Sequence, residues 1–286
     1  MAADRFVEVQ GARIRFRAEG SGPPVLLIHG IGASLEIWDW TFPALRERFT
    51  PVAFDYPGFG VSDPLPWAFS PEGAAEVVTA FMDAMGIRTA FLIGSSLGGG
   101  IATMTAGLAP QRVDGLVLVA PAGFGRGLNP LLRLETTPVL GEVLAAVGGV
   151  FPRLALNQAF ADPKRIPPEL VETSRRYGIR RVPFRSYLRA LRRSATLRGV
   201  RSEMIATVRS AARQIIAPTL IVWGDHDRII PPDQSAVAAH SIKGSRLHMM
   251  KGLGHVPFVE APAPFNTAAV AFLVEVGRPT SVKAAR

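Results

Sequence analysis

Short apolar runs alternate with helix-like stretches along most of the chain. Residues 6–9 and 13–18 alternate apolar and polar positions around Gly11, which predicts an antiparallel entry hairpin. Continuous apolar runs are typical of buried parallel strands, and they occur at residues 25–28, 52–54, 90–93, 115–120, 218–223 and 246–250. The stretches between them carry helix signals, such as Ser70 as N-cap before Pro71 at the first helical position. The pattern predicts an α/β fold with a mostly parallel sheet and helices on both faces.

The alternation of strands and helices breaks between about residues 121 and 216. This segment has no clear buried strand, and its periodicity is helical. Prolines divide it into short pieces, at Pro130, Pro138, Pro152, Pro163, Pro167, Pro168 and Pro183. The break predicts a helical insertion between two strands of the sheet.

Composition places the chain among globular proteins, with 48% hydrophobic and 19% charged residues. Its 286 residues fit one large domain, or a core domain that carries an insertion. The chain has no cysteine, which excludes a disulfide, a thiolate nucleophile and a zinc–thiolate site. No apolar run approaches the roughly 18 residues needed to cross a bilayer. Residues 1–6 lack the pattern of a secretory signal, so we expect a cytoplasmic location.

The formal net charge is +9, and much of the excess is local. Charged runs on helices usually face solvent, and this is what we expect here. The alternative is attraction to an acidic substrate or an anionic surface. We expect no nucleic-acid partner, and contact with a membrane surface stays open. The arginines concerned lie close together in the insertion: Arg175, Arg176, Arg180, Arg181, Arg185, Arg189, Arg192, Arg193, Arg198 and Arg201.

A glycine-flanked serine follows the apolar run at residues 90–93. Gly94-Ser95-Ser96-Leu97-Gly98 matches G-x-S-x-G and precedes a helical pattern. A strand–turn–helix with this motif forms a nucleophile elbow, which lifts the serine hydroxyl above the end of the sheet. The turn strains the backbone at the serine and brings neighbouring chains close, which requires glycine on both sides. The alternative is a glycine-rich turn with an incidental serine.

A second turn, His29-Gly30-Ile31-Gly32, directly follows another apolar run. One of its backbone N–H groups can face the elbow across the top of the sheet. Together with the N–H of Leu97 it would form an oxyanion hole. We expect His29 itself to be structural.

A serine hydroxyl needs a base to become a nucleophile. His255 lies in a glycine-rich loop after the last predicted strand, from which it can reach Ser96. The acid should lie between serine and histidine in chain order, on a loop after a strand. The loop after residues 219–223 offers Asp225 and Asp227, and either can serve.

These pieces resemble the α/β-hydrolase family, specifically its esterase-like branch with a helical cap. The resemblance covers nearly the whole chain. It rests on His29-Gly30-Ile31-Gly32, on Asp55-Tyr56-Pro57-Gly58-Phe59-Gly60-Val61-Ser62-Asp63, on the Ser96 elbow, and on Gly254-His255-Val256-Pro257 with Glu260 and Pro262. It implies an eight-stranded, mostly parallel sheet, with a hydrolase core at residues 1–121 and 215–286. Residues 122–214 would form a helical cap over the pocket.

The resemblance also assigns roles to single residues. The family's acid usually follows Gly-x-x-Asp before an apolar residue and a proline. Gly224-Asp225-His226-Asp227, followed by Ile229-Ile230-Pro231, therefore selects Asp227. The family's oxyanion residue after His-Gly corresponds to Ile31, which pairs with Leu97. The expected triad is Ser96, His255 and Asp227, with no metal and no organic cofactor.

Three activities are compatible with this resemblance. Hydrolysis of a small carboxylic ester through an acyl-enzyme ranks first. Hydrolases of carbon–carbon bonds in ring-fission products use the same triad, but they commonly carry Asn and Trp where this chain has Ser95 and Val256. A ligand receptor that kept the fold without turnover is the third. Relatives that open epoxides or displace halide use a carboxylate nucleophile, which Ser96 disfavours.

Overall fold

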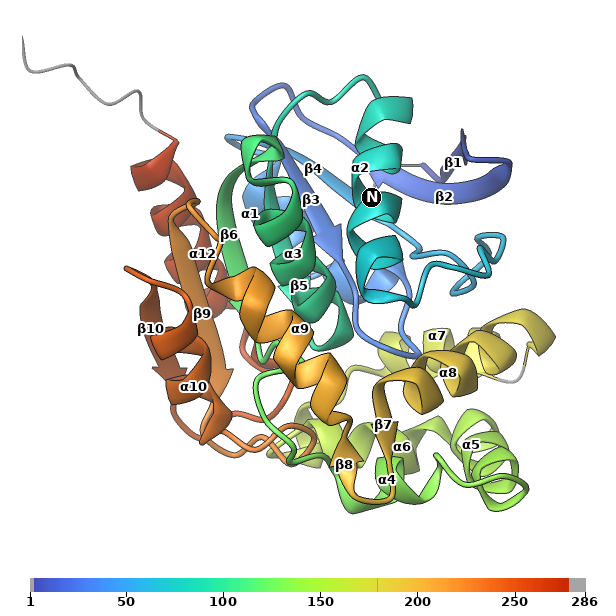
Figure 1. Ribbon diagram of the computed structural model, residues 1–286. Coiled ribbons are helices and arrows are strands. Elements are labelled where there is room, and N and C mark those ends of the chain that lie inside the picture. The colour runs from blue at the N-terminus through green and yellow to red at the C-terminus, as the bar shows by residue number, and fades with distance from the viewer. Residues whose placement is uncertain (1–2, 179, 278–286) are drawn as a thin grey trace, which may run out of the picture.

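An eight-stranded sheet forms the centre of the computed structural model, which describes residues 3–178 and 180–277 (Figure 1). The strand order is β1-β2-β4-β3-β5-β6-β9-β10. Strand β2 pairs antiparallel with β1 and with β4. All further pairs along the sheet, from β4 through β3, β5, β6 and β9 to β10, are parallel. The predicted eight-stranded, mostly parallel sheet is therefore confirmed. The strands are β1 (Arg5–Val9), β2 (Ala12–Ala18), β3 (Pro24–Ile28), β4 (Thr50–Phe54), β5 (Ala90–Ser95), β6 (Val113–Val119), β9 (Thr219–Gly224) and β10 (Arg246–Met250).

Strand β3 shows why the apolar runs form central strands. Its residues from Val25 onward are fully buried, and it pairs with β4 on one side and β5 on the other. Successive side chains of a strand point to opposite faces. Leu26 accordingly joins the hydrophobic cluster on one face of the sheet, and Leu27 joins the cluster on the other. A continuous apolar run is what a strand covered on both faces requires.

Helices cover both faces of the sheet. One face carries α2 (Pro71–Ala84), α3 (Leu97–Leu108), α9 (Ser202–Ala212) and α10 (Gln234–Ser241); the other carries α1 (Phe42–Leu45), α11 (Pro257–Glu260) and α12 (Pro262–Val276) (Figure 1). The predicted start of α2 is confirmed, because the Ser70 hydroxyl accepts a hydrogen bond from the Gly73 amide at 3.0 Å. The helix ends before Gly86, whose φ of +67° suits glycine.

The long segment between β6 and β9 is largely helical. It contains α4 (Pro130–Leu134), α5 (Leu140–Val150), α6 (Pro152–Ala159), α7 (Pro168–Gly178) and α8 (Arg181–Ser194). These five helices lie beyond the carboxyl ends of the parallel strands (Figure 1). A two-residue ladder of β7 (Ala195–Thr196) and β8 (Gly199–Val200) follows, where the sequence predicted no strand.

Helix α9 occupies a different place from the other helices of this segment. The predicted cap at residues 122–214 includes this helix, yet α9 packs against α3 on the sheet and also contacts α10 and α2. We therefore use "cap helices" for α4 to α8 and group α9 with the core.

A buried ionic cluster joins the cap helices to the core. The Arg15 guanidinium donates to Asp55 at 2.6 Å and to the Tyr177 hydroxyl of α7 at 3.0 Å. The same hydroxyl donates to Glu36 at 3.1 Å. Burial alone would lower the pKa of Arg15, but the hydrogen bond and the charge of Asp55 raise it above its usual value. Arg15 is thus a permanent cation, compensated by carboxylates and tied to α7.

Candidate active site

Ser96 lies at the sharp turn between β5 and α3. Its φ is +56°, a conformation that residues with a Cβ rarely adopt. A Cβ on Gly98 would lie 2.2 Å from the Ile28 carbonyl oxygen, and one on Gly94 would lie 2.3 Å from the Gly98 carbonyl oxygen. The two glycines of the motif are therefore required by the close approach of neighbouring backbones.

Two backbone segments flank the Ser96 side chain. Leu97 is the first residue of α3, where amides lack a partner within the helix. Ile31 follows β3, and a Cβ on the preceding Gly30 would lie 3.1 Å from Ser96 Cβ. The Ser96 amide itself donates to the Val119 carbonyl at 2.9 Å. The amides of Ile31 and Leu97 therefore stay the predicted donors of an oxyanion hole at Ser96.

His255 and Asp227 form a buried pair on two neighbouring loops. His255 Nδ1 lies 2.7 Å from Asp227 Oδ2. The other carboxylate oxygen, Oδ1, accepts hydrogen bonds from the amides of Ile229 at 2.8 Å and Ile230 at 3.0 Å. With Nδ1 donating to the carboxylate, Nε2 is the nitrogen free to accept a proton. Asp225, the other candidate, instead accepts a hydrogen bond from the Gly252 amide at 2.7 Å.

The serine and the histidine face the same cavity. Ser96 and His255 both line it, and within the described part of the chain no hydrogen bond joins them. Catalytic hydrogen bonds are often long in the absence of substrate and tighten in the Michaelis complex.

The loop of His255 is fastened to the cap. The His255 amide donates to the Ala159 carbonyl at the end of α6, at 2.7 Å. Glu260, which is buried, accepts hydrogen bonds from the amides of Gly254 at 2.7 Å, Ala161 at 3.2 Å and Asp162 at 2.9 Å. One carboxylate therefore binds the histidine loop and the segment after α6 together.

His29 is structural in its contacts, as expected. Its Nδ1 lies 2.8 Å from the Gly30 carbonyl oxygen, and its Nε2 accepts the Tyr56 amide hydrogen at 3.0 Å. Burial lowers its pKa, so the ring stays neutral with the proton on Nδ1. His29 thereby joins the turn after β3 to the start of the loop after β4.

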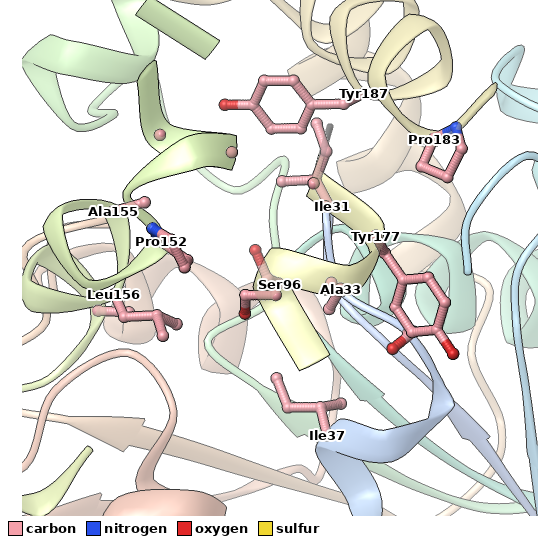
Figure 2. Close-up of a pocket in the computed structure, with 18 of the residues that line it drawn as sticks. Ile31, Ala33, Ile37, Ser96, Pro152, Ala155, Leu156, Tyr177, Pro183 and Tyr187 are labelled. Atoms are coloured by element: carbon pink, nitrogen blue, oxygen red, sulfur yellow. The ribbon is translucent and has the colours of Figure 1, made fainter. Parts of the chain in front are cut away.

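Two cavities meet at Ser96. The larger, about 250 Å³, lies between Ser96 and helices α5 to α8 (Figure 2). The smaller, about 100 Å³, extends from Ser96 between α2, α3 and α9. Ile31, Ser96, Leu132 and Ile229 line both. A substrate whose scissile bond lies at Ser96 therefore has room for one arm in each cavity.

Three polar side chains of the larger cavity were missed in the sequence analysis. Glu135, Tyr177 and Tyr187 line it, and the Tyr187 hydroxyl donates a hydrogen bond to the Glu135 carboxylate. Burial raises the pKa of Glu135, and the hydrogen bond from Tyr187 opposes part of this rise. No local motif marks these residues. The chain has three tyrosines, however, and two of them fall in the insertion.

Only some apolar residues of the cap helices reach the cavities. Leu132 and Leu156 line the larger cavity, whereas Leu131 and Leu140 are not among the described residues that line either one. No arginine or lysine is found among the described residues that line either cavity. Arg185 borders a separate surface hollow on α8. The arginines of the insertion therefore do not line the two cavities, in agreement with the expectation that they face solvent.

The comparisons with known proteins agree on one fold family. The model of the alpha/beta hydrolase fold matches residues 23–262. The chain is 31% identical over 280 residues to 2-hydroxymuconate semialdehyde hydrolase of Pseudomonas sp. (strain CF600), covering 95% of this chain and 94% of that protein.

Solved structures of similar shape include two different kinds of hydrolase. A meta-cleavage product hydrolase from Pseudomonas fluorescens IP01 has a TM-score of 0.79 at 26% identity, covering 95% of this chain and 97% of its own. A membrane phospholipase A, described as a bacterial virulence factor, has a TM-score of 0.79 at 29% identity, covering 97% and 87%.

Proposed function

Because the chain belongs to the α/β-hydrolase fold family, we propose that it is a serine hydrolase of uncharged carboxylic esters. The observation that carries this proposal is the buried His255–Asp227 pair, whose histidine lines the same cavity as Ser96. No arginine or lysine is found among the described residues that line this cavity. The proposed triad is Ser96, His255 and Asp227.

The proposed reaction has two steps. Nε2 of His255 accepts the Ser96 proton as the hydroxyl attacks the acyl carbon, and the imidazolium then protonates the leaving alcohol. The oxyanion is stabilised by the amides of Ile31 and Leu97. Asp227 holds the proton of His255 on Nδ1 and stabilises the imidazolium. Water, activated by the same histidine, then releases the acyl group from Ser96.

The two cavities support a substrate with two arms, such as an ester. The smaller cavity is lined mainly by apolar side chains, including Phe69, Met104 and Val208. The larger contains the polar pair Glu135 and Tyr187. One arm of the ester would therefore be apolar, and the other would meet a carboxyl and a phenol.

Electrostatics favour an uncharged substrate over an acidic one. Ring-fission dienoates carry a carboxylate, and burial of an anion requires a paired charge or several hydrogen-bond donors. Glu135 would repel such a substrate when ionised. Ester hydrolysis therefore ranks before carbon–carbon cleavage.

The decisive test is a substrate panel with wild type and Ser96→Ala. We expect p-nitrophenyl esters of uncharged acids to be hydrolysed, and Ser96→Ala or His255→Ala to lower kcat by roughly 10⁴-fold with folding intact. A serine-reactive phosphonate should label wild type at Ser96. A Ser96→Ala enzyme with near-full activity would refute the serine mechanism.

Carbon–carbon hydrolysis of ring-fission products is the second candidate. The specific observation in its favour is the 31% identity to 2-hydroxymuconate semialdehyde hydrolase over almost the full length of both chains. A ring-fission dienoate in the same panel separates the two. A kcat/KM for the dienoate above that of every ester would reverse our order, whereas phosphonate labelling without turnover of any substrate would favour a ligand receptor.

A further inference from the structure

Helix α5 has two faces of different character. Its inner face carries Ala145, Gly148 and Gly149, which line the larger cavity. The valines of its outer face recur three or four residues apart, which keeps them on one side of the helix. Val143, Val147 and Val150 are 55%, 43% and 48% exposed, and Val139, which directly precedes the helix, is 77% exposed. Helix α5 therefore lines the cavity with one face and exposes an apolar stripe to solvent on the other.

The apolar stripe continues onto α6. Phe151 and Leu154 are 58% and 56% exposed, and we call the four valines with these two residues the cap ridge. No single described helix is long and apolar enough to cross a membrane; α5 and α6 reach that length and hydropathy only as a pair bent by 94°. Contiguous exposed apolar patches on soluble chains mark interaction sites.

A basic strip borders the cap ridge. Arg181, Arg185 and Arg189 recur every four residues on α8 and are exposed. They surround a shallow hollow that also includes Glu142 of α5. Arg192 pairs with Glu142 at 2.7 Å, whereas the other three arginines have no ion pair among the described residues. Cationic side chains thus flank the apolar stripe along the side where α5 meets α8.

Charge indicates which partner fits this surface. In a symmetric dimer the same patch would face itself, which brings two sets of unpaired arginines together. The acid of the patch, Glu142, is already engaged by Arg192. An anionic phospholipid surface offers both complements, acyl chains for the valines and phosphates for the guanidinium groups.

We propose that the cap ridge, with Arg181, Arg185 and Arg189, docks the protein on the surface of an anionic phospholipid bilayer. The ridge lies in the interface plane, and the basic strip contacts the headgroups. The opposite faces of α5 and α6 line the larger cavity. Docking therefore brings two helices that line the cavity into contact with the lipid. A consequence that rests on the proposed function is a preference for amphiphilic esters that partition into membranes.

Vesicle co-sedimentation tests this docking. The full chain is mixed with vesicles of phosphatidylcholine alone and with about 30% phosphatidylglycerol, at salt from about 0.05 M to about 0.5 M. Wild type should bind the anionic vesicles, more weakly at high salt. The double variant Val143→Ser, Phe151→Ser should lower the partition coefficient at least about tenfold. Arg185→Gln with Arg189→Gln should weaken binding and flatten its salt dependence.

Matched controls lie away from the cap. Ile216→Ser removes an apolar side chain that is 77% exposed, more than Val143 or Phe151. Arg88→Gln removes an exposed charge, and both variants should bind as wild type. Unchanged sedimentation of Val143→Ser, Phe151→Ser would overturn the proposal. So would a solution dimer that this variant dissociates, which would assign the ridge to a second copy. Binding is read without turnover, so failure of the ester hypothesis leaves this result interpretable.

Discussion

Ser96 keeps an unfavourable backbone conformation because its neighbours fix it from both sides. Its amide donates to Val119, and its carbonyl accepts the amides of Gly100 at 3.0 Å and Ala122 at 2.9 Å. A non-glycine residue at positive φ costs about 1–3 kcal/mol, which persists only where surrounding contacts over-determine it. The cost is consistent with a functional position, because the strained turn exposes the hydroxyl to the cavity.

The two aspartates of the loop after β9 should differ sharply in function. Asp227→Asn should lower kcat on the order of 10³- to 10⁴-fold, because an amide no longer fixes the proton on Nδ1 of His255. Asp225→Asn should have little effect on kcat, since Asp225 contacts the Gly252 amide instead. Steady-state kinetics of both variants, with thermal unfolding as the folding control, decide this. A greater loss of kcat for Asp225→Asn would contradict the assignment.

Glu135 should make selectivity depend on pH. Its pKa is raised by burial, so the carboxyl is neutral below that pKa and anionic above it. For an ester with a free carboxylate in its acyl arm, kcat/KM relative to a neutral ester should therefore fall as pH rises through the pKa of Glu135. Glu135→Gln should abolish this dependence and raise kcat/KM for the acidic ester about tenfold, a modest charge repulsion of about 1.4 kcal/mol. Identical pH profiles of the ratio in both enzymes would remove Glu135 from substrate selection.

At the scale of elements, the cap helices both line the larger cavity and attach to the core. Helices α5 to α8 supply much of the lining of the larger cavity. Tyr177 of α7 both lines it and enters the buried cluster of Arg15 and Glu36. We propose that residues of these helices select the substrate, whereas the chemical step depends on the core.

Leu156 and Leu140 form a matched pair for testing this division. Leu156 lines the cavity from α6, whereas Leu140 is 45% exposed on α5. Leu156→Ala should shift the acyl-length profile of kcat/KM, since one methylene of complementarity contributes about 1–3 kcal/mol. Leu140→Ala should leave the profile of soluble esters unchanged. Parallel behaviour of the two variants would argue against substrate selection by the cap wall.

Tyr177→Phe should weaken the attachment of the cap to the core more than it destabilises the core itself. Tyr177→Phe removes a hydroxyl that bonds Arg15 and Glu36, while these two remain paired at 2.8 Å. We expect a loss of about 1–3 kcal/mol in the free energy that opposes opening of the cap. Hydrogen exchange should accelerate at α7 amides and stay unchanged at β5. Equal acceleration in both elements would indicate global destabilisation instead.

At the scale of the whole molecule, the sequence predicts the buried strands and the nucleophile elbow better than the contacts that line the cavity or place α9. Buried strands such as β3 follow from continuous apolar runs, and the elbow follows from glycines that local backbone approach requires. Glu135 and Tyr187 meet across 52 positions, and no periodicity encodes such a pairing. The position of α9 on α3 likewise depends on tertiary contacts, because its own sequence is compatible with either layer.

The hydrogen bonds of Glu260 set a limit on exchanging parts between related proteins. Its carboxylate binds the Gly254 amide of the histidine loop and the amides of Ala161 and Asp162 in the insertion. A chimera that replaces the whole insertion would remove two of these donors and leave a buried anion short of partners. The segment at residues 159–162 should therefore stay with the core when a foreign cap is grafted. The catalytic unit therefore extends beyond the strand ends and includes residues 159–162, although these residues lie within the insertion.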